Sequence, residues 1–360
     1  MKGIGVCFGG YCPLHQGHLD VIMRAKKEND ICYVIVCGYD DEPRGWEINL
    51  NHDERFELIE DFFRGDEQIR VRKINDTELG IDQSMSEHNW KVWMDRAHQI
   101  IAEDEDTKDL PIMWYVAEPF YRTNILKNVG QLESVVLCEK HNNVSGTLIR
   151  NNPVKYWNKI AEPFKQYLTK NILIIGTASE GKSTLVRDIS AYFGIPYADE
   201  YGRRYMEYNE MQDTDLLYPD FEKFIEEQNF NCEVNAAITG NGVFIADTDN
   251  TVTLMYADAY AEDPDIEFSH EDLERLHAYA QEKNTIKWDK IFILPPSKDF
   301  VDDGSRYMKQ SSMDERWKNF DRLQKYVNEF YPEVSRTYLN GTFYENFIEV
   351  KRYIQSLLEN

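Results

Sequence analysis

The sequence predicts an α/β protein made of two doubly wound, parallel-sheet domains. Short apolar runs alternate with helix-like segments along the whole chain, as in parallel sheets that are covered on both faces. In each half, an apolar run leads directly into a glycine-rich loop that opens a helix. The length of 360 residues agrees with two domains, at roughly 150 residues per domain.

The first half begins with a strand and keeps the alternation throughout. Amphipathic spacing predicts helices at 19–28 and 52–63. The expected strands are the short apolar runs 4–8, 31–37, 69–74, 112–116 and 134–138.

The pattern restarts after residue 170. Amphipathic helices are predicted at 221–234 and 314–330, and another helix opens near Lys182. The expected strands are 171–175, 242–246 and 290–294. We therefore expect a first domain over residues 1–155, a linker helix over 156–170, and a second domain over 171–360. The acidic runs 103–109 and 262–267 are interpreted as solvated loops.

The charge balance argues against nucleic acid as a partner. The chain has 40 Lys and Arg against 64 Asp and Glu, a formal net charge of −24. Such an acidic body is a poor general binder of nucleic acid or anionic membranes. Scattered cysteines without zinc spacing, no signal-peptide pattern and no apolar run of about 18 residues favour a cytoplasmic protein without membrane insertion.

The loop after the first strand carries a phosphate-binding pattern. Residues 9–18 read Gly-Gly-Tyr-Cys-Pro-Leu-His-Gln-Gly-His, and small residues at a helix start let backbone amides approach an anion. His15 and His18 can place two imidazoles on one triphosphate and stabilise charge as the α-phosphate is attacked and pyrophosphate leaves. Two chance loop histidines, or a metal pair, are the alternatives. The other expected nucleotide contacts are Gly9, Gly10, Tyr11 and Gly17.

A second element strengthens this interpretation. The loop resembles the first signature of the nucleotidyltransferase superfamily, whose second signature reads Ser-x-Thr-x-x-Arg at the start of a late helix. Ser145, Thr147 and Arg150 match that signature. Ser145 would cap the helix and bind phosphate with Thr147, while Arg150 would hold the β- and γ-phosphates.

Further resemblance is to the adenylyltransferases of NAD synthesis. An aromatic residue in the region of Trp46 stacks on nicotinamide in similar enzymes, and a cationic pyridinium suits a Trp face. The alternative is that Trp46 only packs. Arg55 is expected as a substrate contact or a helix salt bridge. Glu118, in an Ala-Glu-Pro-Phe-Tyr element, is expected on the nucleotide side.

The second glycine loop matches the pattern G-x-x-x-x-G-K-[ST] of a P-loop. Residues 176–183 follow an apolar strand and open a helix, which is the context that the motif requires. The loop would cradle ATP, with Lys182 bridging β- and γ-oxygens and Ser183 coordinating Mg²⁺. The expected phosphate-binding residues are Gly176, Thr177, Ala178, Ser179, Glu180, Gly181, Lys182, Ser183 and Thr184.

Acidic residues near two later strand ends indicate kinase chemistry. Asp199 or Glu200 would accept the proton of an attacking hydroxyl, with a surface ion pair as the alternative. Asp247 stands in the Walker-B position and would hold Mg²⁺ through water. Asp249 is interpreted as a ribose contact, and an acidic turn is the alternative for this pair.

A polar segment near residue 306 suits a lid over the phosphates. Arg306, and with it Arg316, would neutralise charge on the transferred phosphoryl group. Arg316 lies in a helix rich in charges, so a solvated-face role is favoured for it.

The combination of both motifs in one chain resembles the bifunctional NadR family, nicotinamide-mononucleotide adenylyltransferases fused to ribosylnicotinamide kinases. The resemblance also rests on 200–205, 247–249 and 302–306, with Gly202 and Arg204 departing from the more usual Glu-Tyr-Ala-Arg-Glu-Tyr. Some members carry an N-terminal DNA-binding module. Because the first strand begins near residue 4, we expect neither this module nor direct DNA repression here.

The resemblance implies a bifunctional enzyme of NAD salvage. The second domain would phosphorylate nicotinamide riboside with ATP to nicotinamide mononucleotide (NMN), and the first would adenylylate NMN to NAD and pyrophosphate. A functional link to a riboside transporter follows by analogy. The alternatives are a fusion of phosphopantetheine adenylyltransferase with dephospho-coenzyme-A kinase, and a nucleotide sensor with impaired turnover. The choice of ATP over GTP and the oligomeric state stay open.

Overall fold

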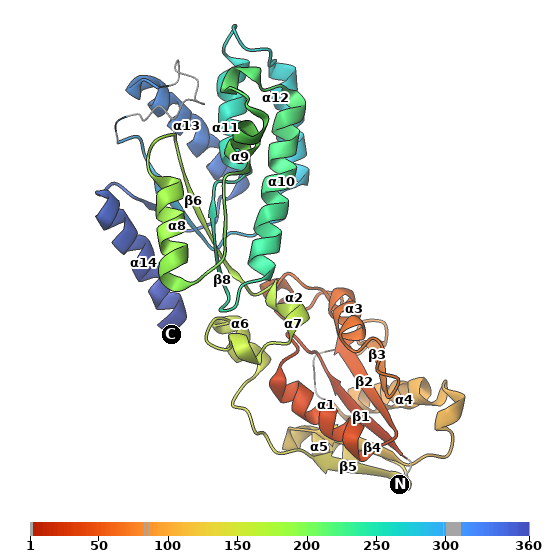
Figure 1. Cartoon of the computed structure of the whole chain (residues 1–360). Helices are drawn as coiled ribbons and strands as arrows, with labels where there is room; N and C mark the ends of the chain where they lie inside the picture. The colour runs from red at the N-terminus through yellow and green to blue at the C-terminus, as the bar shows by residue number, and fades with distance from the viewer. Residues whose placement is uncertain (1–2, 83, 85, 298, 300–310, 360) are drawn as a thin grey trace. The chain divides into compact units, whose positions relative to one another are not determined.

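A computed structural model describes residues 3–82, 84, 86–297, 299 and 311–359 (Figure 1). The chain divides into two compact units, Met1–Leu168 and Thr169–Asn360. Each unit contains one five-stranded sheet in which every pair of neighbouring strands is parallel. The predicted fold class is therefore confirmed.

The sheet of the first unit has the order β3-β2-β1-β4-β5. Because β1 lies between β2 and β4, the strand order reverses there, and ligands of such sheets bind outside the carboxyl ends at that point. The strands are β1 (Ile4–Gly9), β2 (Ile31–Gly38), β3 (Ile69–Asn75), β4 (Ile112–Val116) and β5 (Glu133–Leu137). The helices are α1 (Gln16–Glu28), α2 (Pro43–Glu47), α3 (His52–Phe62), α4 (Glu87–Ala102), α5 (Pro119–Leu126), α6 (Gly146–Asn151) and α7 (Glu162–Lys165), with 3₁₀ turns η1 (Glu105–Thr107) and η2 (Trp157–Lys159).

Helices cover both faces of this sheet. Side chains of α1 and α3 pack with alternate residues of β1 and β2, such as Cys7 and Val34, in one core. The intervening residues, such as Val6 and Ile35, face α4 and α5 in a second core. The strands read as continuous apolar runs in the sequence because both faces are buried.

Residues 156–170 do not form the predicted linker helix. They form η2 and the single turn α7, and their apolar side chains belong to the core of the first unit, with Phe164 fully buried. The amide of Ala161 donates to the carbonyl of Leu14 at 3.0 Å, directly beside His15. The apolar side chains that sequence reasoning assigned to a linker therefore support the loop that follows β1.

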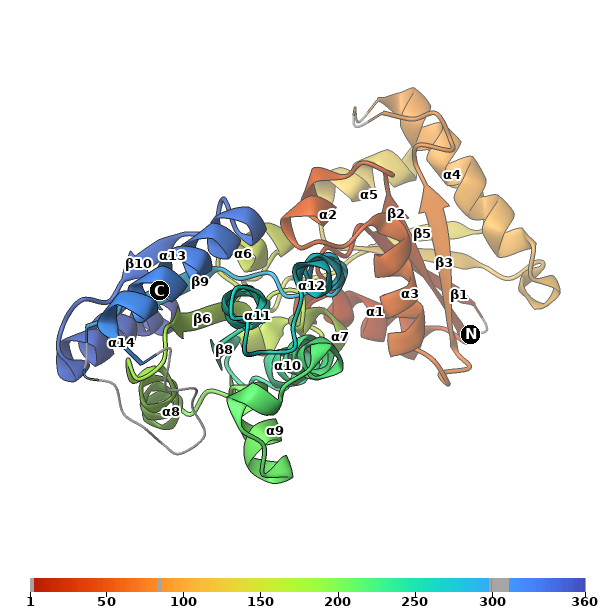
Figure 2. The same cartoon turned by 90° about the horizontal axis from the view of Figure 1, so that it is seen from above.

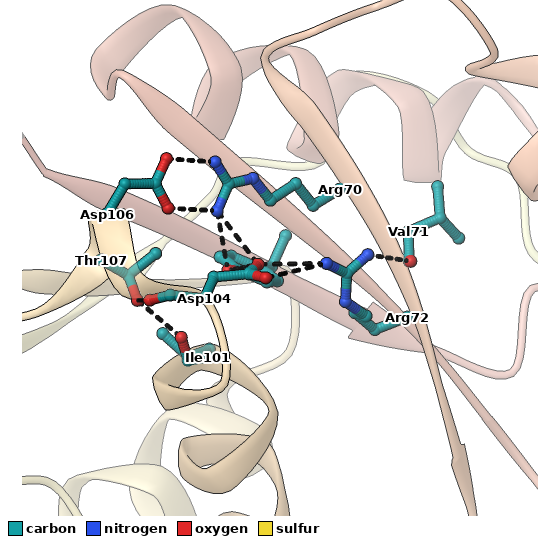
Figure 3. Close-up of polar contacts among 8 residues, drawn as sticks. Arg70, Val71, Arg72, Ile101, Asp104, Asp106 and Thr107 are labelled. Atoms are coloured by element: carbon teal, nitrogen blue, oxygen red, sulfur yellow. Dashed lines mark hydrogen bonds and ion pairs between the residues drawn. The ribbon is translucent and has the colours of Figure 1, made fainter.

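The acidic run 103–109 is also more than a solvated loop. Asp104 accepts from Arg70 and Arg72, at 3.0 Å in each case, and Asp106 pairs with Arg70 through two oxygens (Figure 3). Thr107 donates to the carbonyl of Ile101 at 2.6 Å. These contacts hold the turn after α4 against β3, since a bidentate arginine pair fixes orientation as well as distance.

The sheet of the second unit has the order β10-β9-β6-β8-β7, again with its first strand at the centre. The strands are β6 (Lys170–Gly176), β7 (Tyr197–Ala198), β8 (Val243–Asp247), β9 (Lys290–Leu294) and β10 (Arg336–Tyr338). The helices are α8 (Lys182–Phe193), α9 (Tyr201–Asn209), α10 (Tyr218–Ala237), α11 (Asn250–Ala261), α12 (His270–Glu282), α13 (Met313–Phe330) and α14 (Phe343–Glu359), with a 3₁₀ turn η3 (Asp213–Asp215).

Two helical layers cover the second sheet. Helices α8 and α14 lie side by side against one face, and α10, α11 and α13 pack on the other (Figures 1 and 2). An additional aromatic cluster joins α10, α11 and α12 beyond the sheet edge, centred on Phe221 and Tyr260. This cluster forms a wall beside the carboxyl end of β8.

Among the residues that the structure describes, no helix is long and apolar enough to cross a membrane.

Candidate active sites

The first site lies at the carboxyl end of β1, where the two predicted histidines meet. His15 is the N-cap of α1, and its Nδ1 accepts the amide of Gly17 at 3.1 Å. The imidazoles of His15 and His18 are stacked with ring centres 3.7 Å apart. A neutral imidazole that accepts at Nδ1 carries its proton on Nε2. This bond therefore leaves Nε2–H of His15 as the hydrogen-bond donor.

Burial keeps both rings neutral. It lowers the pKa of His15 to about 4, against a small opposing effect of Asp20. Burial also lowers the pKa of His18 well below its usual value, and the neighbouring His15 adds to that effect. Two stacked imidazolium ions would repel each other, so burial and repulsion both favour neutral rings, each of which can donate one hydrogen bond.

The predicted second signature lies against the same loop. Ser145 is the N-cap of α6 and accepts the amide of Leu148 at 3.2 Å. A Cβ on Gly146 would come within 2.6 Å of the carbonyl oxygen of Cys12, so only glycine allows this close approach. Arg150 donates to that same carbonyl at 2.6 Å. The two signatures are thus joined through backbone contacts.

Arg150 is already engaged by acceptors of the protein. Its Nε pairs with Glu47 of α2, and its third nitrogen lies 3.4 Å from the hydroxyl of Thr147. Glu47 is about half exposed. A bound triphosphate would have to replace Glu47 on the guanidinium, since both are anionic acceptors.

A cavity of about 280 Å³ brings the predicted nucleotide residues together. Glu118 also lines it and pairs with Lys140, which sequence reasoning did not single out. The predicted residues in its lining are Gly9, Gly10, Tyr11, His15, Gly17, His18, Glu118, Ser145, Thr147 and Arg150.

Two predicted substrate residues have different environments. Trp46 on α2 is 63% exposed, so it is no core residue and its ring is accessible for stacking. Arg55 is completely buried and pairs with the buried carboxylate of Glu42, while also donating to the carbonyl of Leu50. Direct contact of Arg55 with a substrate would break its ion pair with Glu42. Of the two roles expected for Arg55, the structure therefore agrees with the salt bridge.

A second cavity, of about 190 Å³, shares Gly9, Gly10 and Arg44 with the first. Asp76, directly after β3, also lines it; burial raises the pKa of Asp76 to about 7, with a further contribution from Glu42. The aromatic residues in its lining are Phe8, Tyr39, Trp90, Trp93 and Tyr121.

Sequence reasoning missed this second cavity. Trp90 and Trp93 occur at helical spacing, which is typical of core residues. Asp76 and Arg44 could have been identified from the sequence as candidate site residues. Each follows a predicted strand, and ligands of parallel sheets bind at the carboxyl ends of the strands.

The second site is the predicted P-loop, between β6 and α8. Gly181 has a left-handed φ of +85°, which glycine adopts without strain. The ammonium of Lys182 donates to the carbonyl of Thr177 at 2.9 Å and folds back over the loop. The loop therefore presents its amides and the start of α8 to an anion.

Glu180 and Arg316 form a buried ion pair that sequence reasoning did not predict. Both side chains are almost completely inaccessible, and Arg316 also donates to the carbonyl of Ala178 at 3.0 Å. Glu180 accepts the amide of Ser297 at 3.0 Å. The solvated-face interpretation of Arg316 is wrong, because this face of α13 packs on the P-loop. The Glu180 carboxylate holds Arg316, which also lines the cavity beside the P-loop.

Asp247 fits a magnesium site. It is the last residue of β8 and is buried, and its Oδ1 accepts no hydrogen bond from any described residue. Burial raises the pKa of Asp247 to about 6, which Lys182 opposes, Glu200 reinforces and a hydrogen bond with Ser183 lowers. Mg²⁺ prefers oxygen ligands and keeps several waters or phosphates. Asp247 and Ser183 therefore suit an ion that is bound to a nucleotide.

The residues after Asp247 form the turn into α11 and hold its start in place. Thr248 has a left-handed φ of +80°, an uncommon conformation for a β-branched residue and one that marks strain at the strand end. Asp249 caps α11 through the amide of Thr251 at 3.1 Å and accepts the hydroxyl of Tyr331 at 2.6 Å. The buried Asp249 carboxylate is thus occupied by protein donors, which argues against the predicted ribose contact.

The structure separates Asp199 from Glu200. Glu200 lines the cavity beside the P-loop together with Lys182, whereas Asp199 is not part of that lining and lies 4.0 Å from Arg204. Gln228 accepts the amide of Tyr201 and donates to the carbonyl of Thr248, which ties the start of α9 to the end of β8. The other wall of this cavity is aromatic and includes Phe221, Phe224, Tyr256 and Tyr260. Arg306 lies outside the described residues.

Comparisons with known proteins give the same division of the chain into two domains. Residues 6–152 match a family model described as cytidylyltransferase-like, and residues 171–345 match one described as an AAA domain. The class is therefore a Rossmann-like nucleotidyltransferase domain followed by a P-loop domain.

Similarity extends across both domains. The trifunctional NAD biosynthesis/regulator protein NadR of Salmonella typhimurium is 29% identical over 325 residues, covering 86% of this chain and 73% of that protein. The Escherichia coli protein of the same name is 28% identical over 324 residues, with the same coverage. The chain is a homologue of these NadR proteins.

Solved structures show the same relationship. A crystal structure of NadR protein in complex with NR has a TM-score of 0.85 and 26% identity, and covers 100% of this chain and 96% of that one. A crystal structure of NadR protein in complex with NAD and AMP-PNP has a TM-score of 0.83 and 25% identity, with coverage of 100% and 97%.

The buried histidine predicts acid sensitivity. The pKa of an unfolded His is about 6.5, whereas that of folded His15 is about 4. Between these values the unfolded state binds more protons, so stability falls as the pH drops through this window. We expect His15→Gln to weaken the fall in unfolding midpoint, measured by circular dichroism from about pH 7 to about pH 4. The exposed His88, changed to Gln, is the control and should retain the wild-type fall; an equal fall in both variants would contradict the assignment.

Proposed function

We propose that the chain is a bifunctional transferase of NAD biosynthesis that converts nicotinamide riboside and ATP to NMN, and NMN and ATP to NAD and pyrophosphate. One observation supports this most directly. Two separate phosphate-binding loops, after β1 and after β6, each border a cavity of their own within their own unit. A chain with one site for nucleoside phosphorylation and one for adenylyl transfer needs this arrangement.

Adenylyl transfer is assigned to the first site. A phosphate oxygen of NMN attacks the α-phosphorus of ATP, the bond to the β-phosphate oxygen breaks, and pyrophosphate leaves. The attacking phosphate is already ionised, so the step requires charge stabilisation rather than a base. His15, His18 and Arg150 supply donors for the triphosphate. Arg44, which lines both cavities, stands where the two phosphates would meet.

The acceptor is assigned to the aromatic cavity that shares Gly9, Gly10 and Arg44 with the nucleotide cavity. A cationic pyridinium is attracted to aromatic faces and to a nearby carboxylate, and Trp90 and Asp76 provide both. The exposed Trp46 is a second stacking surface on α2, the helix that also carries Arg44.

Phosphoryl transfer is assigned to the P-loop site. The 5′-hydroxyl of the riboside attacks the γ-phosphorus of ATP, its proton passes to Glu200, and ADP leaves. Lys182 and the loop amides hold the phosphates. Mg²⁺, held by Ser183 and Asp247 together with the nucleotide, would neutralise phosphate charge. Mg²⁺ at such a site takes its remaining ligands from nucleotide phosphates and water. Among the described residues no group of three His, Cys, Asp or Glu side chains is placed to hold a metal.

Other observations favour this function over its rivals. The P-loop reads Gly-Thr-Ala-Ser-Glu-Gly-Lys, unlike the usual dephospho-coenzyme-A kinase loop, and its Glu180 is built into the fold through Arg316. Glu200 and Lys182 line one cavity, and the buried Asp247 keeps an oxygen that accepts no hydrogen bond from a described residue, which supports turnover over sensing. The six cysteines are free thiols, which fits a reducing, cytoplasmic environment.

Product analysis tests the assignment. With ATP and nicotinamide riboside, the purified chain should release ADP and NMN first, then pyrophosphate and NAD, resolved by chromatography over time. Phosphopantetheine in place of the riboside should give no product. Riboside binding without turnover would identify a sensor, and turnover of phosphopantetheine would identify the coenzyme A enzyme; either would overturn the proposal.

The position of Glu200 predicts a selective loss of the first reaction. Glu200→Gln keeps the size of the side chain but removes the proton acceptor, so kcat for riboside phosphorylation should fall by roughly a hundredfold or more, as for other general bases. NAD formation from supplied NMN should be unchanged. Asp199→Asn, the adjacent carboxylate outside the cavity, is the matched control and should retain most activity. The reverse ranking of the two variants would make Asp199 the base.

A further inference from the structure

One buried glutamine joins the backbone beside the two acidic residues of the proposed kinase site. Gln228 lies in the middle of α10 and is 3% exposed. Its Oε1 accepts the amide of Tyr201 at 2.8 Å, and its Nε2 donates to the carbonyl of Thr248 at 3.2 Å. Tyr201 directly follows Glu200, and Thr248 directly follows Asp247. A single side chain is therefore bonded to the residue next to each acid.

The bond to Tyr201 holds the start of α9. Glu200 is the N-cap of this helix, but its side chain makes no capping hydrogen bond within the described part of the chain. The first amides of a helix have no partner inside the helix. Gln228 supplies the acceptor for the first of them from a different helix. Because α9 has no buried residue, a bond to a buried side chain helps to fix where α9 begins.

The bond to Thr248 holds the end of β8. Thr248 has a left-handed φ of +80°, and such a conformation persists only where the surrounding structure keeps it. The amide of Thr248 donates to the carbonyl of Ile174 in β6 at 3.1 Å, while its carbonyl accepts from Gln228. Nε2 of Gln228 also lies 3.5 Å from the carbonyl oxygen of Asp247. Both backbone groups of the strained residue are thus held, directly beside the acid.

The two acids need such a frame. Glu200 contributes to the raised pKa of Asp247, so the two carboxylates are close enough to repel each other. Gln228 lines the same cavity as Glu200, but both its Oε1 and its Nε2 are bonded to the backbone. Its amide therefore serves the frame of the site rather than a ligand.

We propose that Gln228 is a positioning residue for phosphoryl transfer, which sets Glu200 relative to Asp247 by holding the backbone beside each. The proton acceptor and the carboxylate of the proposed magnesium site thereby keep a fixed separation. The inference deepens the proposed kinase function and rests on it. A misplacement of about 1 Å at a reacting group can cost roughly a hundredfold in rate, so a side chain that touches no substrate can control kcat.

Kinetics of Gln228→Met test the proposal. Methionine has a similar length and fills irregular space, so it keeps the packing of α10 while breaking both bonds. For riboside phosphorylation, kcat should fall roughly tenfold to a hundredfold, with little change in KM for the riboside or for ATP. NAD formation from supplied NMN should be unchanged.

The next residue of α10 offers a matched control. Asn229 donates to the carbonyl of Lys283 at the end of α12, at 2.9 Å, and does not line the cavity. Asn229→Leu breaks a comparable bond between helices and should retain the wild-type kcat, with circular dichroism confirming that both variants fold. An unchanged kcat in Gln228→Met, or an equal loss in Asn229→Leu, would overturn the proposal. A raised KM for the riboside at unchanged kcat would overturn it too, because Gln228 would then be a substrate contact.

The same bond can be broken from its other end, which keeps the proposal testable if Gln228→Met does not fold. Tyr201→Pro removes the donor amide at the first position of α9, where proline is tolerated. Tyr201→Ala removes the ring but keeps the amide. We expect a kcat roughly tenfold lower for Tyr201→Pro than for Tyr201→Ala. Equal values in the two variants would contradict the proposed role of the bond.

A binding measurement without turnover tests the Asp247 side. Calorimetry follows ADP binding to the full chain as Mg²⁺ is raised, and Lys182→Ala identifies the binding event that belongs to the P-loop. Gln228→Met should need roughly tenfold more Mg²⁺ for the half-maximal effect on ADP binding, and Asn229→Leu should not. An unchanged Mg²⁺ requirement in Gln228→Met would overturn the proposal. Failure of the wild-type chain to phosphorylate the riboside would instead refute the proposed function, and the Mg²⁺ requirement would still decide the role of Gln228.

Discussion

The close approach of backbone at the ends of the two central strands is the constraint on which both sites depend. A Cβ on Gly146 would meet the backbone carbonyl oxygen of Cys12, in the loop after β1, and a Cβ on Gly176, the last residue of β6, would meet the backbone carbonyl oxygen of Leu294. At each place the absence of a side chain lets the loop pack tightly while its amides stay available to phosphate. In a chain with a net charge of −24, anionic ligands can be held only where amides and a few cations are concentrated in this way.

Part of the acidic surplus is used inside the fold to hold these loops. Glu180 pairs with Arg316 beneath the P-loop, and Glu42 pairs with Arg55 beside the first site. Removing one partner of a buried pair leaves an uncompensated charge and is strongly destabilising, by about 3–5 kcal/mol in measured cases. Both pairs therefore fix loop positions, and Arg316 also lines the cavity beside the P-loop. Sequence alone favoured solvent for Arg316 and left Arg55 as a substrate contact or a helix salt bridge.

The sequence predicted the fold class and the two phosphate loops because those features are local. A strand, a glycine loop and a helix follow one another in the chain, so His15, His18, Lys182 and Ser183 could be assigned without tertiary information. Features that depend on distant segments could not be predicted. Nothing near Arg316 in sequence indicates Glu180, and the cavity that contains Asp76 and Trp90 is assembled from five separate segments. The packing of residues 156–168 into the first core was missed because proline punctuation indicated a linker.

The central claim is that the two reactions occur at two independent sites of one chain, and a mixing experiment tests it most directly. His18→Ala removes a proposed triphosphate donor of the first site, and Lys182→Ala removes the proposed phosphate-binding lysine of the second. With nicotinamide riboside and ATP, the first variant should accumulate NMN without NAD, and the second should form neither. An equimolar mixture should form NAD, because NMN made by one variant is adenylylated by the other. NAD from either variant alone, or no NAD from the mixture despite NMN accumulation, would contradict the account.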